Sequence, residues 1–145
     1  MSARFLLGAN ALSEPARPSP DAGFMAKFEL HRHSLATAAT AWHEVLYGMH
    51  ALPAGHKRDA IERYLLGTLL PTIDILAYDE ASAAWHASER GRLRAAGRPV
   101  PFADGQVAAV AARYDLALVT NNEADFATYT GLRVVNWISG PQRRT

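Results

Sequence analysis

Leu116-Ala117-Leu118-Val119-Thr120 is an almost wholly apolar run, and the polar turn 121–125 follows it directly. Short apolar runs bounded by turn-forming residues are typical of buried strands. A second run, Arg4-Phe5-Leu6-Leu7-Gly8, has the same character and is stopped by a glycine. These two segments predict the strands around which the fold is built.

The segments between these runs alternate between the two kinds of regular structure. Further short strands are expected at residues 34–37, 72–77 and 133–135. Helices are expected over residues 20–31, 40–52, 56–70, 79–96 and 104–114, with Ser19 and Thr40 as N-caps of the first two and a short helical piece after residue 125. Strands that alternate with helices predict an α/β fold with a parallel sheet.

Length and composition restrict the function classes. With 145 residues the chain fits one domain, expected over residues 1–140, with residues 141–145 as a short C-terminal tail. The net charge of +1 argues against binding to nucleic acid by bulk charge alone, and the absence of cysteine excludes disulfides and thiolate metal sites. No export signal or run of about 20 apolar residues is present, so we expect a cytoplasmic protein that does not enter membranes.

Three carboxylates have an unusual setting, and no nucleotide-binding glycine loop or serine-hydrolase motif competes with them. Glu44 lies inside an apolar helix, Asp104 opens a helix rich in Ala and Val, and Asp125 follows the Leu116–Thr120 strand. Taken singly, Glu44 fits a solvated helix face, Asp104 an N-cap and Asp125 a turn. Ligands of parallel sheets bind beyond the carboxyl ends of strands, so together these acids predict an acidic pocket suited to a hard divalent cation.

Four motifs in order carry a resemblance to a known family. They are Leu6-Leu7-Gly8-Ala9-Asn10-Ala11-Leu12-Ser13-Glu14, Trp42-His43-Glu44-Val45-Leu46-Tyr47-Gly48, Pro101-Phe102-Ala103-Asp104 with Gln106-Val107-Ala108-Ala109, and Val119-Thr120-Asn121-Asn122 with Asp125-Phe126. The chain resembles, from Arg4 to Trp137, the PIN-domain ribonucleases, specifically the VapC-type toxins of bacterial toxin–antitoxin pairs.

The resemblance implies a PIN-like three-layer sandwich whose parallel five-stranded sheet has the order 3-2-1-4-5 and is flanked by helices. It also implies an endoribonuclease that uses Mg²⁺ or Mn²⁺, with Glu44, Asp104 and Asp125 as catalytic and metal-binding acids. Asn10 and Thr120 match polar residues that support the pocket. A chance match in an unrelated α/β protein would be expected to show another strand order.

One position departs from the family pattern. After the first strand the family has L-L-D-x-N, and here Gly8 stands where that pattern has its first metal-binding aspartate. The chain is therefore expected to bind metal weakly and to cleave RNA poorly or not at all. Either the chain is an inactivated variant of an active toxin, or it is a non-catalytic PIN-fold module that binds an antitoxin or RNA without cleaving it.

Two further surfaces are predicted. Four arginines, Arg90, Arg92, Arg94 and Arg98, cluster before Asp104 and are candidate RNA contacts, although cations near a helix C-terminus need no ligand. The resemblance also implies a VapB-type antitoxin partner and a toxin homodimer. The helical pair 40–70 could supply an apolar groove for the partner, with Trp42, Leu46, Met49, Tyr64 and Leu65 as its lining or simply as core.

Overall fold

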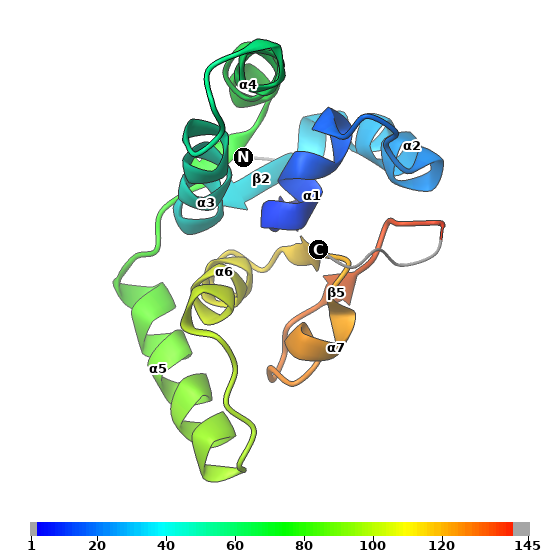
Figure 1. Cartoon of the computed structure of the whole chain (residues 1–145). Coiled ribbons are helices and arrows are strands. Elements are labelled where there is room, and N and C mark those ends of the chain that lie inside the picture. The colour runs from blue at the N-terminus through cyan, green and yellow to red at the C-terminus, as the bar shows by residue number, and fades with distance from the viewer. Residues whose placement is uncertain (1–2, 141–145) are drawn as a thin grey trace.

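The computed structural model describes residues 3–140, and its centre is a five-stranded parallel sheet (Figure 1). The strands are β1 (Phe5–Leu7), β2 (Leu35–Ala38), β3 (Asp74–Leu76), β4 (Ala117–Val119) and β5 (Val134–Val135). Their order is β3-β2-β1-β4-β5, and every neighbouring pair is parallel. The expected fold class and strand order are confirmed, and the predicted tail 141–145 lies outside the described residues.

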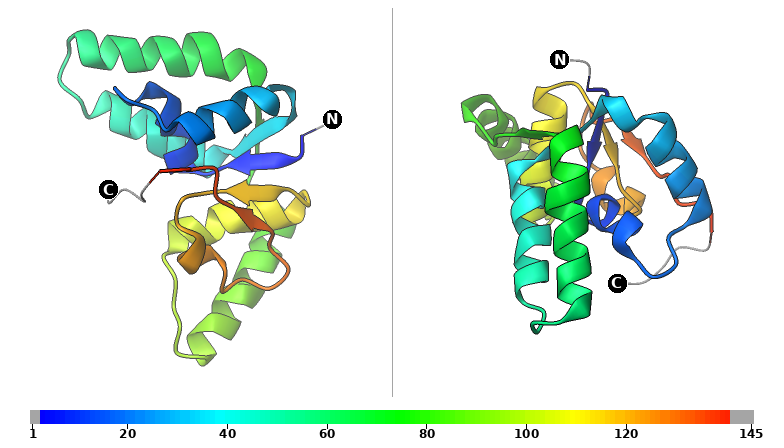
Figure 2. Two further views of the ribbon diagram at one scale, coloured as in Figure 1. Left: turned by 90° about the vertical axis from the view of Figure 1, so that its right-hand side faces the viewer. Right: turned by 90° about the horizontal axis from the view of Figure 1, so that it is seen from above.

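Helices cover both faces of this sheet (Figure 2). They are α1 (Ala9–Ser13), α2 (Ala22–Leu30), α3 (Ala39–His50), α4 (His56–Glu62), α5 (Glu80–Ala95), α6 (Phe102–Arg113) and α7 (Glu123–Phe126), with a π-helical turn η3 (Arg63–Leu69) continuing α4 and short 3-10 turns η1 (Glu14–Ala16), η2 (Arg32–Ser34) and η4 (Leu70–Thr72). None of the helices within residues 3–140 has the length and hydropathy that crossing a bilayer requires.

The two predicted N-caps are wrong. Helix α2 is capped by Asp21, whose carboxylate accepts a hydrogen bond from the Phe24 N–H at 2.8 Å. Strand β2 runs directly into α3, so the N-cap is the extended residue Ala38 and Thr40 already lies inside the helix. Likewise α6 begins at Phe102, two residues earlier than expected.

The core is formed by the apolar runs that predicted the strands. Leu6, Leu7 and Leu118 are completely buried, as expected for a sheet covered on both faces. The strand register aligns Leu7 with both Thr37 of β2 and Val119 of β4. Because the strands are parallel, the residues that follow β1, β2 and β4 emerge at one edge of the sheet, and this edge carries the site.

Candidate functional site

A cleft of about 700 Å³ opens where β1 and β4 end. Five positions singled out in the sequence line it: Gly8, Asn10, Glu44, Asp104 and Thr120. They come from the ends of two strands and from α1, α3 and α6, so the fold gathers residues that are far apart in the chain. Other lining residues had no predicted site role, among them His43, Tyr47, Gln106 and Asn122, and Thr40 was expected only as an N-cap.

Asp104 is the most perturbed acid of the cleft. It lies in the first turn of α6 and is only partly exposed; the N-cap of that helix is Pro101, so the alternative reading of Asp104 as an N-cap is wrong. Burial raises the pKa of the Asp104 carboxyl, and the negative charges of Asp125 and Glu44 raise it further. Three acids from α3, α6 and α7 therefore interact electrostatically around one site.

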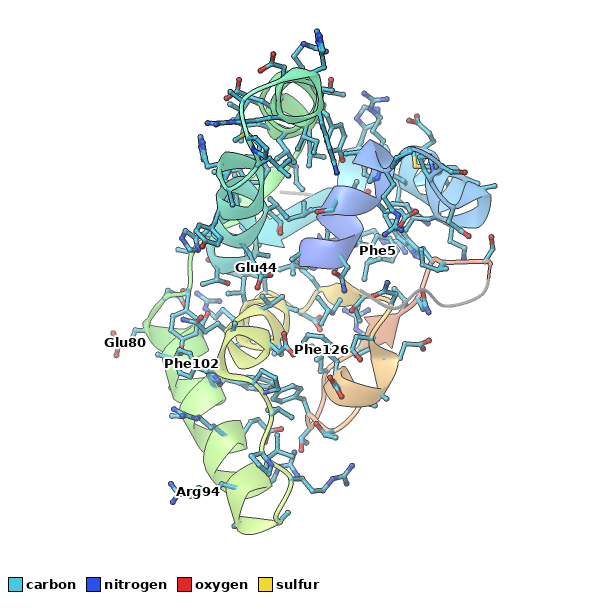
Figure 3. All side chains as sticks on the ribbon, in the orientation of Figure 1. Phe5, Glu44, Glu80, Arg94, Phe102 and Phe126 are labelled. Carbon is cyan, nitrogen blue, oxygen red and sulfur yellow. The ribbon has the colours of Figure 1, made fainter. Side chains whose placement is uncertain are left out.

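Glu44 and Asp125 are both exposed, but they stand differently toward the cleft. Glu44 projects from α3 and lines it, as the labelled side chain in Figure 3 illustrates. Asp125 lies at the margin, where its Oδ2 accepts a hydrogen bond from Nδ2 of Asn122 at 2.8 Å. Asn122 in turn donates its backbone N–H to Oγ1 of Thr120 at 3.1 Å. The end of β4 thus holds Asp125 through a chain of hydrogen bonds.

The amide side chain of Asn10 bridges the two strand ends. Its Nδ2 donates a hydrogen bond to Oδ1 of Asn121 at 2.9 Å. The segment after β1 is thereby tied to the segment after β4. The sequence motif contained Asn121 and Asn122, but only the geometry gives them these linking roles.

Gly8 is buried between β1 and α1, and nothing in its surroundings requires a glycine. Its φ of −74° and ψ of 174° are extended values that any L-residue adopts. A Cβ built on Gly8 would lie 3.4 Å from the Val119 carbonyl oxygen and 3.9 Å from Cδ1 of Leu118, which are ordinary contacts. A Cβ therefore fits at this position, so neither the backbone nor the neighbouring atoms require a glycine there.

The carboxylates of the cleft are the type of ligand that a divalent ion prefers, but too few of them lie close together. Carboxylate oxygens are the ligands that Mg²⁺ and Mn²⁺ prefer. Within residues 3–140, however, no three His, Cys, Asp or Glu side chains lie close enough together to hold an ion. With no side chain at Gly8, the cleft holds an incomplete set of ligands.

The helix that carries Asp104 rests on a buried histidine of α5. His86 is 3% exposed, its Nδ1 lies 2.9 Å from Oη of Tyr78, and its ring packs 5.0 Å from the Phe102 ring. Gly105, directly after Asp104, contacts the same imidazole. Burial lowers the pKa of His86, and the positive charge of Arg90 lowers it further, so the ring favours the neutral form.

The four predicted RNA contacts separate into two kinds. Arg92 is held by Glu89 through two hydrogen bonds of 3.0 Å and donates a third, at 2.7 Å, to the Thr128 carbonyl. Arg90, Arg94 and Arg98 are exposed, and none forms an ion pair within the described part of the chain. Arg92 therefore has a structural role that the other three lack.

Comparison with known proteins places this arrangement in a family. Residues 5–132 match the model of the PIN domain. The chain belongs to the PIN-domain family. It is 31% identical to the toxin FitB of Neisseria gonorrhoeae over 124 residues, covering 83% of this chain and 89% of that protein. It is 29% identical to the tRNA(fMet)-specific endonuclease VapC of Shigella flexneri, covering 92% of this chain and 98% of that protein.

Solved structures of the family share the fold. The toxin chain in the structure of FitAB bound to the IR36 DNA fragment is 26% identical, with a TM-score of 0.84 over 97% of this chain and 99% of that chain. The structure of FitAcB from Neisseria gonorrhoeae is 29% identical, with a TM-score of 0.82 over 91% of this chain and 96% of that chain. The resemblance to VapC-type PIN domains that the sequence motifs carried is confirmed.

Proposed function

We propose that this chain is an endoribonuclease toxin of the PIN family whose catalytic centre is weakened because Gly8 replaces one metal ligand. The observation that carries the proposal is that Glu44 and Asp104 line one cleft, with the charge of Asp125 acting on Asp104 from its margin, beside a position whose surroundings admit a Cβ. Full-length relatives named as ribonucleases and endonucleases support the reaction class.

The remaining acids would hold Mg²⁺ or Mn²⁺ with Asp104 as the principal ligand. A bound ion supplies a water of lowered pKa and polarises the phosphoryl oxygen of the RNA. Asp104 suits the central role because burial and neighbouring charges make its carboxylate a strong attractor of cations. Glu44, exposed on the wall of the cleft, is placed to orient the attacking water, while Asn122 fixes the direction of Asp125.

The test restores the acid at position 8. The Gly8→Asp variant is expected to bind Mn²⁺ by calorimetry and to cleave RNA, with cognate RNA included through total cellular RNA, whereas the parent chain does neither well. Gly8→Asn is the matched control, because it adds a side chain of the same size without the charge. Adding Asp104→Asn to Gly8→Asp is expected to abolish both signals. A folded Gly8→Asp chain that neither binds Mn²⁺ nor cuts RNA would contradict the proposal.

A specific groove also favours a protein partner. A hollow of about 560 Å³ between α1, α3 and the α4–η3 helix is lined mainly by apolar side chains, among them Val45, Met49, Leu52, Ile61 and Leu65, and the cations Arg17 and Lys57 also line it. It shares Ala9, Asn10 and Glu44 with the cleft, so an occupant of the groove would reach the acids. Of the five residues predicted for this groove, Met49 and Leu65 line it, whereas Trp42, Leu46 and Tyr64 pack against the core.

We propose that a VapB-type antitoxin segment occupies this groove, with an apolar helix face inside and acidic residues toward the rim. The named FitAB and VapBC complexes among the structural relatives support a partner of this kind. The proposal also includes a toxin homodimer acting in the cytoplasm. Co-purification with the product of an adjacent small gene, and its loss on Leu52→Arg, would support it, and light scattering of the purified chain tests the dimer. Unchanged co-purification of Leu52→Arg would contradict the groove assignment.

A further inference from the structure

A second hollow, distinct from the cleft, lies beside the C-terminal half of α5. Its volume is about 550 Å³, and its lining is Ala87, Arg90, Gly91, Arg94, Pro99 and Val100. Arg90 and Arg94 are one helical turn apart and share a face, while the small side chains of Ala87 and Gly91 leave the space between them open. Two cations are thus directed to one hollow.

Neither of these two arginines forms an ion pair. Within residues 3–140, Arg17, Arg32, Arg92, Arg113 and Arg133 each form one, whereas Arg90 and Arg94, like Arg4, Arg58, Arg63 and Arg98, form none. Like charges one turn apart repel and destabilise a helix. An anionic ligand in the hollow would relieve this repulsion.

An exposed aromatic ring connects the hollow to the cleft. Phe102 is 49% exposed, an unusual state for a large apolar side chain, and the guanidinium of Arg90 lies 4.9 Å from its ring centroid. The next two residues, Ala103 and Asp104, line the cleft. Figure 3 shows Phe102 between Glu44 and Arg94, so acid, ring and arginine follow one another along this side of the molecule.

We propose that Phe102, Arg90 and Arg94 form a binding surface for single-stranded RNA that continues out of the cleft. The inference rests on the proposed nuclease function and assigns part of its substrate surface. Guanidinium groups bind phosphate oxygens in a fixed, paired geometry, and an exposed aromatic ring stacks on an unpaired base. Phe102 holds a base next to the cleft, and the two arginines hold the phosphates that follow it.

Not all of the four predicted arginines belong to this surface. Arg92 points its donors at Glu89 and the Thr128 carbonyl, so it does not belong to the surface. The ring of Phe102 beside two unpaired cations favours a nucleic acid over an acidic peptide, because bases and phosphates alternate along a strand. Binding of an acidic peptide is therefore the competing outcome of the test.

The test measures RNA binding without cleavage. The parent chain with Gly8 is titrated, in EDTA, into a labelled single-stranded oligoribonucleotide of mixed sequence, and anisotropy is recorded at several salt concentrations. The double variant Arg90→Gln/Arg94→Gln is expected to reduce the magnitude of the slope of log K against log salt by about 1.4, because each of the two lost phosphate contacts contributes about 0.7. Phe102→Leu is expected to weaken binding about 5- to 100-fold and leave that slope unchanged.

The matched control is Arg32→Gln, which removes a partly buried arginine of η2, the turn that follows α2 and lies outside α5. It should change neither affinity nor slope beyond the general loss of one charge. Thermal unfolding confirms that each variant folds, and glutamine keeps much of the side chain that covers the helix.

The results separate this inference from the proposed function. An unchanged slope for the double arginine variant, no RNA binding by the parent chain, or arginine-dependent binding of a poly-glutamate peptide but not of RNA would each overturn the surface. If Gly8→Asp still cleaves RNA in any of those cases, the nuclease proposal stands without it. If Gly8→Asp is inactive while the parent binds RNA through these residues, the surface stands and the nuclease proposal falls.

Discussion

Replacing Gly105 by alanine tests how firmly the fold holds Asp104. A Cβ on Gly105 would overlap Nε2 of His86, and it would lie 2.8 Å from Cδ2 and 3.1 Å from Cε1 of the same ring. Carbon atoms prefer separations of about 3.5–4.0 Å, so the imidazole must retreat by more than about 0.7 Å. His86 is 3% exposed and tied to Tyr78, so the retreat strains packing and stretches a hydrogen bond.

The expected destabilisation follows from three opposing contributions. Overpacking costs about 1–3 kcal/mol, and losing the Tyr78 hydrogen bond adds about 0.5–1.5 kcal/mol. The better helix propensity of alanine returns about 1 kcal/mol. Gly105→Ala should therefore lower the free energy of unfolding by about 0.5–3.5 kcal/mol, or the melting temperature by about 1–14 °C for a chain of this length.

Urea and thermal denaturation measure the effect, and Gly91→Ala is the matched control. Gly91 lies inside α5, and a Cβ there would meet nothing within 4 Å, so that substitution should stabilise by about 0.5–1 kcal/mol. Adding His86→Ala to Gly105→Ala should remove the steric part of the penalty. A Gly105→Ala chain as stable as the parent would refute the idea that His86 fixes the position of α6. In the Gly8→Asp background, a displacement of Asp104 by about 1 Å should also reduce cleavage about 10²-fold.

Three further predictions concern charges in the fold. Because its pKa is raised, Asp104 binds its proton more tightly in the folded than in the unfolded chain, so stability falls as pH rises above the ordinary aspartate range. The Asp104→Asn chain should therefore be more stable than the parent at pH 7 but not in acid, and urea denaturation at several pH values measures this difference. Asp21 accepts backbone hydrogen bonds from residues 139–140, which lower its pKa, so its contribution is lost as pH falls below the ordinary range; Asp21→Ala should speed hydrogen exchange at those amides. Glu89 accepts the Thr130 N–H at 2.6 Å, and Glu89→Ala should speed exchange at that amide while leaving β1 unaffected.

Sequence patterns predicted the elements better than their ends. The runs at β1 and β4 are apolar because both faces of these strands are covered, and such a run can be recognised from the local sequence alone. The start of α2 depends on Asp21, which also binds the backbone of residues 139–140. Ser19 and Asp21 are both residue types that favour N-caps, so the local sequence does not separate them, and the hydrogen bonds to residues more than a hundred positions away fix Asp21 at this helix end.

The acids of the site were predicted from other signals. The end-of-strand rule pointed to the segment with Asp125, and the family motifs pointed to Asp104 and Asp125; Asp104 lines the cleft, and the charge of Asp125 acts on it from the margin. The hydrogen-bond partners of the arginines in α5 could not be predicted in the same way. Arg90 and Arg92 are identical residues two positions apart, but only Arg92 faces Thr128, whose position depends on the chain beyond α7.

The stability of the fold does not depend on which side chain stands at position 8. The backbone at Gly8 is extended and its N–H donates to the Val119 carbonyl at 3.1 Å, so the strand pairing needs no particular side chain there. An aspartate at this N-cap of α1 would add at most a few tenths of a kcal/mol over glycine, and its charge would add to the repulsion already present at Asp104. Without metal, a further acid at position 8 would therefore add little to the free energy of unfolding. Under the proposed function, selection for such an acid comes from the ion and the substrate, so its loss would weaken function and leave the structure intact.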